Sequence, residues 1–515
     1  MRKVSHLLIL GDQLTDQVGP LRALLEKLQH YAQPLFVAEL TGIRREKRHL
    51  QAVVMQVAAL RAFAEDLRSR GIATEVVAGE TLELVLDEIK STHHPEAITV
   101  MDPAQPQDLV VLQEWAATTG TPLTIAENEL WLTSRAAWTD FRSGRKELRM
   151  EFWYRRVRGA RGWLMEEGDA SKPLGGTWNL DEENRQRLGS GTVVPITPNP
   201  SIPAAAARVL NELRADKVEL FGSMEEFRWP ITRVDALAEL EDFCSERLAG
   251  FGPYEDAMSR EYEHLFHSLL SPALNLGLLT PQEVCVRALR EYTERPNEIP
   301  LSSIEGFIRQ ILGWREFMHH AYVDFWQEWE SDNGLNAHEA LPAFYWSGET
   351  KMACVQRVVK KVQRTGHAHH IERLMVLGNF ALLFGVTPQA VDSWFLEGFI
   401  DALPWVVTPN VVAMSQFADL GRITSKPYIS GGAYISRMGD DCSVCPYSPK
   451  ESTGDGACPF TTLYWDFIDR HSDRFARNPR MATQVRAWAA RPEVTRLEIR
   501  TRARQVHVLA ERGEL

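Results

Sequence analysis

The chain has 515 residues and a mass of 58.4 kDa, enough for about three domains of ordinary size. Its 44% hydrophobic and 24% charged residues exclude a disordered, collagen-like or disulfide-scaffold protein. The net charge of −12 excludes a uniformly basic nucleic-acid-binding coat but permits a local basic groove. We find no apolar run of about 18 residues and no signal-peptide cleavage pattern. We therefore expect a cytoplasmic protein without a membrane-spanning segment.

The first 130 residues alternate between short apolar runs and longer amphipathic stretches. The runs predict strands at 6–10, 35–40, 74–77, 97–101 and 123–126, and the stretches predict helices at 21–30, 48–70, 82–91 and 108–118. This alternation indicates a parallel sheet with helices on both faces. Ligands of such sheets lie beyond the carboxyl ends of the strands, where Gly11-Asp12-Gln13 and Asp102-Pro103 occur. A Gly-Asp pair after a strand is also compatible with an ordinary turn.

Glycine and proline are concentrated between residues 165 and 205, which predicts a linker without helices. From about residue 206 the pattern is helical, with the clearest helices at 242–248, 281–293, 304–322, 355–362, 370–383 and 388–397. We therefore expect an α/β domain (1–135), an interdomain linker (136–205) and a large all-helical domain (206–515).

Six cysteines are too few for a disulfide scaffold in a chain of this length. Cys442, Cys445 and Cys458 share one glycine- and proline-containing loop, and Cys354 is the candidate for a fourth ligand. Four thiolates suit a [4Fe–4S] cluster or tetrahedral zinc. The single Cys-x-x-Cys pair and the prolines after Cys445 and Cys458 favour the cluster, with zinc and unligated thiols as alternatives.

Other motifs with chemical potential lie in the predicted helical domain. The run 266–272, Phe-His-Ser-Leu-Leu-Ser-Pro, is compatible with a phosphate site at a helix start and with a plain helix cap. The run 367–370, His-Ala-His-His, is compatible with metal binding, acid/base chemistry or a solvated helix start. Trp314, Trp346, Trp394 and Trp405 are compatible with core packing or with electron transfer to a cofactor.

In this order, the domains and the motifs His-Ser-Leu-Leu-Ser-Pro, Trp-Arg-Glu-Phe and His-His-x-x-Arg resemble the photolyase/cryptochrome superfamily. The four-cysteine set narrows the resemblance to iron–sulfur bacterial cryptochromes and prokaryotic (6-4) photolyases. The resemblance implies FAD in the helical domain, a [4Fe–4S] cluster near the C-terminus and a 6,7-dimethyl-8-ribityllumazine antenna in the α/β domain. It also implies blue-light-driven electron transfer from reduced FAD to a flipped-out (6-4) lesion in UV-damaged duplex or single-stranded DNA.

The resemblance assigns roles to individual residues. For FAD it implies Tyr254, His267, Ser268, Leu269, Leu270, Ser271, Arg373, Asp401 and Val407. For catalysis it implies His369 and His370, for electron transfer Trp346 and Trp394, and for the lesion pocket Arg309, Gln310 and Tyr428. For the antenna it implies Leu10, Gly11, Asp12 and Glu39, and for the cluster Cys354, Cys442, Cys445 and Cys458. A basic DNA-facing surface is expected from Lys360, Lys361, Arg422, Lys426 and Arg437.

Two positions depart from the family pattern. Val407 stands where a polar side chain usually faces flavin N5, and Phe395 lacks the hydroxyl of a redox-active tyrosine. Val407 favours a photoreceptor that signals through a partner protein, whereas the retained histidines favour repair of DNA. A light-independent iron–sulfur protein that binds nucleic acid, similar to primase large subunits, is a further alternative. We expect a monomer.

Overall fold

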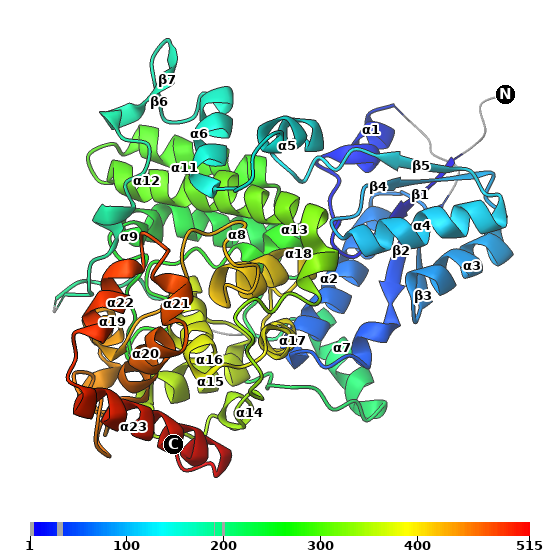
Figure 1. Cartoon of the computed structure of the whole chain (residues 1–515). Helices are drawn as coiled ribbons and strands as arrows, with labels where there is room; N and C mark the ends of the chain where they lie inside the picture. Colours follow the sequence, from blue (N-terminus) through cyan, green and yellow to red (C-terminus); the bar gives the residue numbers. More distant parts are fainter. Residues whose placement is uncertain (1–4, 28–33, 190, 198–200) are drawn as a thin grey trace.

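A computed structural model describes residues 5–27, 34–189, 191–197 and 201–515. In these residues, the N-terminal domain has a five-stranded parallel sheet of order β3-β2-β1-β4-β5 (Figure 1). The strands are β1 (Ser5–Ile9), β2 (Leu35–Leu40), β3 (Thr74–Gly79), β4 (Ala97–Met101) and β5 (Leu123–Ala126). The helices are α1 (Gly19–Lys27), α2 (Leu50–Ser69), α3 (Leu82–His93) and α4 (Pro106–Thr119). The predicted α/β fold is confirmed, and residues 28–30 of its first predicted helix lie outside the described residues.

Alternating side chains of the strands build two separate cores, one on each face of the sheet. Ile9 and Val37 pack with residues of α2 such as Val54, whereas Leu8 and Phe36 pack with residues of α3 and α4. Because β1 lies between β2 and β4, the strand order reverses direction beside β1. In open α/β sheets this reversal opens a crevice at the carboxyl ends of the strands.

The segment between the two domains contains helices at its start and extended structure afterwards. It comprises α5 (Arg135–Arg142), α6 (Met150–Arg161), the hairpin β6 (Met165–Glu166) and β7 (Asp169–Pro173), and short 3-10 turns at Leu174–Gly176 and Asp181–Asn184. The next helix, α7 (Ala204–Ala215), packs against α2, so the chain returns to the α/β domain before it enters the helical domain (Figure 1).

The rest of the chain is helical, as predicted. The helices are α8 (Arg233–Asp242), α9 (Leu248–Phe251), α10 (Ser271–Leu276), α11 (Pro281–Glu294), α12 (Leu301–Ile308), α13 (Glu316–Trp329), α14 (Phe344–Ser347), α15 (Ala353–Thr365), α16 (Asn379–Phe384), α17 (Pro388–Gly398), α18 (Pro404–Thr408), α19 (Gly432–Met438), α20 (Pro459–Arg470), α21 (Ser472–Phe475), α22 (Ala482–Ala489) and α23 (Glu493–Glu511). Among the described residues, no helix combines the length and apolar character needed to cross a bilayer.

Several helices of this domain contain π-helical segments, in which one extra residue is inserted into a turn. They are η4 (Phe243–Arg247), η5 (Arg309–Arg315), η6 (Glu372–Gly378) and η7 (Pro409–Ser415). The predicted helix 304–322 is therefore α12, η5 and α13 in succession, and the predicted helix 370–383 combines η6 with α16. Such π-bulges are rare and often occur at functional sites.

Candidate functional site

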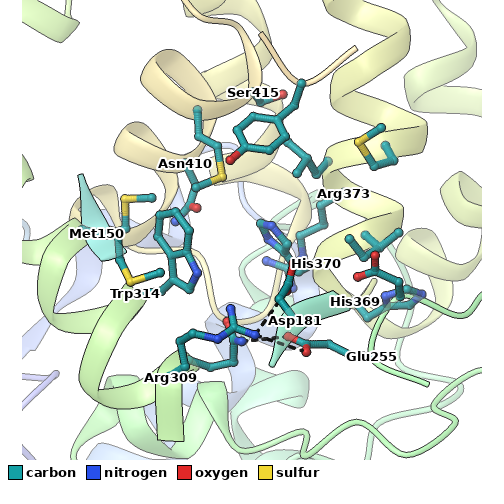
Figure 2. Close-up of a pocket in the computed structure, with 18 of the residues that line it drawn as sticks. Met150, Asp181, Glu255, Arg309, Trp314, His369, His370, Arg373, Asn410 and Ser415 are labelled. Atoms are coloured by element: carbon teal, nitrogen blue, oxygen red, sulfur yellow. Dashed lines mark hydrogen bonds and ion pairs between the residues drawn. The ribbon is translucent and has the colours of Figure 1, made fainter. Parts of the chain in front are cut away.

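The helical domain encloses a cavity of about 1200 Å³. Its walls include residues of η5, η6 and η7, the segment 267–275 and part of the interdomain segment (Figure 2). Elements far apart in the sequence therefore meet at one place, and the π-helical segments supply many of the side chains that face it.

Most of the residues assigned to FAD and the lesion line this single cavity. They are His267, Ser268, Leu269, Ser271, Arg309, Gln310, His369, His370, Arg373, Asp401, Val407 and Tyr428. Leu270 and Tyr254 are not among the lining residues. Leu270 is buried in the core, and the Tyr254 ring stacks on Phe266 with a centroid distance of 5.2 Å.

Arg373 and Asp401 form a bidentate ion pair on the cavity wall. Their Nη1–Oδ1 and Nη2–Oδ2 distances are 2.9 and 3.1 Å. Ser271 Oγ donates to Asp401 Oδ2 at 2.7 Å, and Arg373 Nε donates to the carbonyl of Ala368 at 2.6 Å. Since the geometry of both side chains is fixed by charge-assisted hydrogen bonds, the wall presents a preorganised cation beside a carboxylate.

The segment 267–271 is held in a conformation that ordinary sequences avoid. Leu269 adopts a φ of +60°, a left-handed conformation that non-glycine residues seldom take. The two ring nitrogens of His267 lie 2.9 and 3.1 Å from the backbone carbonyls of His264 and Glu255, so the neutral ring donates to one of them. Arg247 donates to the carbonyl of His267. Local strain that the surroundings hold in place is a feature of ligand sites.

His369 and His370 follow α15 and enter the cavity just before η6 (Figure 2). The His369 ring stacks on His267 at 4.3 Å, and neither of its ring nitrogens has a hydrogen-bond partner within the described residues. Burial and the Arg373 guanidinium lower the pKa of His370 to about 4, although its ring is open to the cavity. Two neutral imidazoles are therefore available to a ligand. A ligand would also supply the hydrogen bonds that the buried ring nitrogens of His369 lack.

An acidic and basic cluster forms the opposite wall, where the predicted Arg309 and Gln310 meet two carboxylates that the sequence did not reveal. Arg309 bonds Asp181 at 3.2 Å and lies 3.8 Å from Glu255, and Gln310 donates to Glu255 at 2.7 Å (Figure 2). Burial is the main cause that raises the pKa of Glu255 to about 7. Asp181 belongs to the interdomain segment, whose glycine and proline content gave no signal of a site wall.

Two groups of indoles approach the cavity. Trp346, which is 38% exposed, lies 6.4 Å from the buried Trp394, which contacts Phe395 on the cavity wall at 5.3 Å. Trp314 and Trp405 line the cavity directly. The first group therefore connects the surface to the cavity through aromatic contacts.

Val407 lies on the cavity wall as an apolar side chain. Asn410, one helical turn further in η7, also lines the cavity and donates through Nδ2 to the carbonyl of Val406 at 2.7 Å (Figure 2). Thus η7 supplies an amide group to the cavity close to the position where the polar side chain is replaced.

The four candidate metal ligands line a second, smaller cavity. Cys354, Cys442, Cys445 and Cys458 surround it, although the described residues contain no three ligands placed for a single metal ion. Four thiols around one small cavity suit a [4Fe–4S] cluster or tetrahedral zinc. A Cβ at Gly432 would lie 2.8 Å from Cys458 Sγ, so glycine is needed here. Burial raises the pKa of the Cys354 thiol well above its usual value, and it raises the pKa of Cys458 to about 11.

The carboxyl edge of the N-terminal sheet carries a group of acids. Asp12 follows β1, and its pKa is raised to about 7 by burial and by Asp108. Burial also raises the pKa of Asp108, to about 6, and that of Asp102. Leu10 is buried, and Glu39 is bonded to Arg44 and Arg61 at 2.9 and 2.8 Å.

Similarity to known proteins identifies the family. A family model described as "Deoxyribodipyrimidine photo-lyase-related protein" matches residues 7–229. A protein of Agrobacterium fabrum named (6-4) photolyase is 37% identical over 502 residues, which cover 96% of this chain and 97% of that protein. The chain belongs to the photolyase/cryptochrome superfamily. The membership inferred from the sequence motifs is thus confirmed.

Solved structures of photolyases and cryptochromes have the same fold. A bacterial class III photolyase from Agrobacterium tumefaciens aligns over 99% of both chains with a TM-score of 0.57 and 15% identity. A cryptochrome of Synechocystis aligns over 95% of both chains with a TM-score of 0.57 and 14% identity. The expected order of an α/β domain and a large helical domain is therefore that of the superfamily fold.

The basic residues expected at the DNA surface divide into two groups. Lys426 and Arg437 line the large cavity, together with Arg149, Arg155, Arg185 and Arg480. Lys361 is buried and its Nζ donates to Glu372 at 3.0 Å, so the prediction that it faces DNA is wrong. Lys360 pairs with Glu349 on the surface, and the Arg422 guanidinium lies over the Phe325 ring.

Proposed function

We propose that this chain is a blue-light-dependent (6-4) photolyase, a flavoprotein that repairs pyrimidine (6-4) photoproducts in UV-damaged DNA. The observation that carries the proposal is the single cavity that combines the Arg373–Asp401 pair with His369 and His370. The near full-length similarity to a (6-4) photolyase supports the same reaction. The similarity also disfavours a light-independent iron–sulfur protein that binds nucleic acid.

We assign the FAD site to the inner part of the cavity. The residues that would hold it are His267, Ser268, Leu269, Ser271, Arg373, Asp401 and Val407, with Leu270 and Tyr254 supporting them from behind the wall. Bound and reduced FAD would supply an electron to the lesion after it absorbs blue light. The Arg373 cation favours negative charge beside it, and the Asp401 carboxylate holds that cation in place.

The outer part of the cavity would receive the flipped lesion. Ligand pockets usually measure about 300–1,000 Å³, so a cavity of about 1200 Å³ has room for a cofactor and a nucleotide. His370 would donate the proton that the transferred group needs, and His369 would fix its position. Because a pKa of about 4 leaves the His370 ring neutral, this role requires the negative charge of the bound lesion to raise that pKa. Arg309, Gln310 and Tyr428 form the walls that read the base.

DNA would reach the cavity across a rim of basic residues. Lys426, Arg437, Arg149 and Arg480 line the cavity and offer counter-charges to phosphates. Because each neutralised phosphate releases counterions, the affinity should fall steeply with salt. Flipping an already unstacked lesion costs less than flipping a normal base, which provides selectivity for damage.

Two further groups complete the proposal. The four cysteines would hold a [4Fe–4S] cluster that ties the C-terminal loop to α15, because all four line one small cavity. A ribityl-lumazine antenna would lie at Leu10, Gly11, Asp12 and Glu39, where buried acids accept hydrogen bonds from its hydroxyl groups. Trp346 and Trp394 would pass electrons inward for photoreduction, with Phe395 only packing between Trp394 and the cavity because its ring is not redox-active.

Val407 keeps a second function open, that of a blue-light photoreceptor with a signalling partner. An apolar side chain at this wall position removes a hydrogen-bonding group that repair enzymes of the family usually carry. The test is illumination of the reduced protein with an oligonucleotide that contains a (6-4) lesion, followed by chromatography. Restored pyrimidines establish repair, whereas normal photoreduction without restored pyrimidines leaves the photoreceptor function.

A further inference from the structure

A buried network of charges connects the cysteine loop to the histidine pair. Asp441, Arg357, Glu372 and Lys361 form it, and we call this set the ionic strut. Arg357 binds Asp441 through two hydrogen bonds of 2.8 and 2.9 Å and binds Glu372 at 2.5 Å. Lys361 binds the other carboxylate oxygen of Glu372 at 3.0 Å.

The strut is buried and electrically balanced. The exposed fractions of the side chains are 16% for Arg357, 1% for Asp441, 2% for Glu372 and 1% for Lys361. Two cations face two carboxylates, so neither sign remains uncompensated in the low-dielectric interior. Removing one partner from such a network leaves the other charge buried and unpaired, which strongly destabilises the fold.

The two ends of the strut lie at two different sites. Asp441 directly precedes Cys442, and Arg357 lies one turn after Cys354 on α15. At the other end, the backbone N–H of His369 donates to Glu372 Oε2 at 3.3 Å, and the ring Nε2 of His369 lies 3.8 Å from the same oxygen.

Lys361 connects the ionic strut to a third segment of the chain. Its Nζ donates to the carbonyl of Glu263 at 2.5 Å, in the segment that leads to His267. The ring of His267 stacks on that of His369, so His267 is connected to Glu372 through His369. Glu372 also precedes Arg373, the cation of the proposed FAD site.

We propose that the ionic strut transmits the position of the cysteine loop to the histidine pair, with Glu372 as the positioning residue. The inference deepens the proposed function and rests on it, because it concerns how the lesion-facing histidines are held. Glu372 acts through His369 and does not contact the lesion. A purely structural network would stabilise the fold without linking changes at Asp441 to the order of residues 366–373.

The first test is hydrogen–deuterium exchange on the purified protein with its cofactors. Asp441→Asn removes the charge at the cysteine end while keeping the shape of the side chain. We expect at least a threefold faster exchange in peptides covering 366–373, and a similar change in Glu372→Gln. Unchanged exchange of these peptides in Asp441→Asn overturns the inference, and this readout does not depend on repair.

The second test is a double-variant comparison of affinity for lesion-bearing and intact duplexes. We expect Glu372→Gln and Asp441→Asn each to reduce the preference for the lesion-bearing duplex about 10-fold. The double variant should retain the same preference as the single variant that has lost more. Asp324→Asn is the control, because Asp324 is a buried carboxylate bonded to Arg135, Arg142 and Trp138 outside the cavity.

The outcomes of the two tests separate the inference from the proposed function. If the two losses of lesion preference multiply in the double variant while FAD content and melting temperature are retained, the two residues act independently and the inference is overturned. A wild-type protein without any preference for the lesion overturns the proposed function, while the exchange experiment still decides whether the strut exists. If Glu372→Gln does not fold, Glu372→Asp, which keeps the charge, takes its place.

Discussion

The helical cavity and the sheet edge of the N-terminal domain treat their charges in opposite ways. In the cavity, Arg373 is paired with Asp401 and Arg309 with Asp181. At the sheet edge, Asp12 and Asp108 have no ion pair within the described residues, and burial raises the pKa of both. The two ion pairs fix charges in the cavity, although Glu255 on its wall also has a pKa raised to about 7. At the edge Glu39 is paired with Arg44 and Arg61, whereas Asp12 and Asp108 are carboxyl groups with raised pKa values.

Because of this difference, the two regions suit different kinds of ligand. Paired charges are preorganised and suit a ligand whose own charge changes during a reaction. Carboxyl groups with raised pKa values accept or donate hydrogen bonds according to pH, and suit a neutral ligand rich in hydroxyl and N–H groups. The cavity therefore suits the proposed chemistry, and the edge suits the proposed antenna binding.

The largest expected effect breaks the chemistry of the cavity and leaves the edge intact. His370→Ala should reduce conversion of a (6-4) lesion by at least about 100-fold, because a positioned acid contributes about 10²–10⁴-fold. The measurement is chromatography of the illuminated oligonucleotide. FAD content, photoreduction and antenna absorbance should match those of the wild type, and lesion conversion at the wild-type rate would exclude His370 as the donor.

The second largest effect concerns the small cavity that the four cysteines line in the helical domain, since the sheet edge has no such group of thiols within the described residues. Cys354→Ser should abolish iron binding and lower the melting temperature, because the ligands lie on segments far apart in the sequence and the centre closes a long loop. Iron and sulfide analysis with thermal melting measures both. Cys285→Ser is the control, since Cys285 is a buried thiol in α11 outside this cavity. Full iron content in Cys354→Ser would remove Cys354 from the ligand set.

The paired charges of the cavity can be tested directly with Asp401→Asn. The substitution keeps the side-chain size but leaves Arg373 without its charge-assisted partner. Hydrogen bonds to charged groups contribute about 1.5–3 kcal/mol, so FAD affinity should fall about 10- to 100-fold. Titration of the apoprotein with FAD measures the loss. Asp324→Asn should bind FAD as the wild type does, and equal affinities of the two variants would contradict the assigned role.

The N-terminal domain was largely predictable from sequence, for a physical reason. Each short apolar run that predicted a strand overlaps one: β2, β4 and β5 are bounded as predicted, β1 begins and ends one residue earlier, and β3 extends two residues further. A local pattern carries this information because a strand of a parallel sheet covered on both faces reads as a short continuous apolar run. The four-cysteine set and the His-His-x-x-Arg motif likewise identified residues that meet at two cavities.

What the sequence did not reveal depends on contacts between remote segments. Asp181 joins Arg309 only because the interdomain segment folds over η5, and nothing in its local composition signals this contact. The π-helical turns are invisible to a 3.6-residue periodicity. Lys361 was assigned to DNA because adjacent lysines usually face solvent, yet its partner Glu372 lies eleven residues away and buries it.

The titrating edge gives a smaller effect than the cavity. Asp12→Asn removes the carboxyl group whose pKa is raised to about 7, so ligand binding at the edge should lose most of its dependence on pH between 6.5 and 8. The pH dependence that remains should lie near pH 6, where Asp108 titrates. In the wild type, raising the pH through 7 adds a buried negative charge and should change the affinity for 6,7-dimethyl-8-ribityllumazine. Fluorescence titration with this compound measures it. FAD content should not change, and a pH-independent wild type would contradict the role of Asp12.

The smallest expected effect concerns the contact between the N-terminal domain and the helical domain. His49 caps α2, where its Nδ1 accepts from the N–H of Gln51 at 3.1 Å, and its Nε2 lies 3.3 Å from the carbonyl of Gln363 in α15. Gly222, with a φ of +84°, lies against the ring, and a Cβ there would approach it to 2.0 Å. The fully buried ring therefore fastens the N-terminal domain to the helical domain.

Burial lowers the pKa of His49 from 6.5 to about 4. As the pH falls through 6.5 the unfolded chain binds a proton and the folded protein does not, so stability is lost between pH 6.5 and 4. His49→Asn keeps a capping oxygen but does not titrate, and it should destabilise the protein at pH 7.5 through lost packing. Because only the wild type loses stability on acidification at this site, the difference should shrink by about 1.4 kcal/mol at pH 5.5. Melting curves of both proteins at the two pH values measure it, and a constant difference would show that His49 is protonated or solvated in the folded protein.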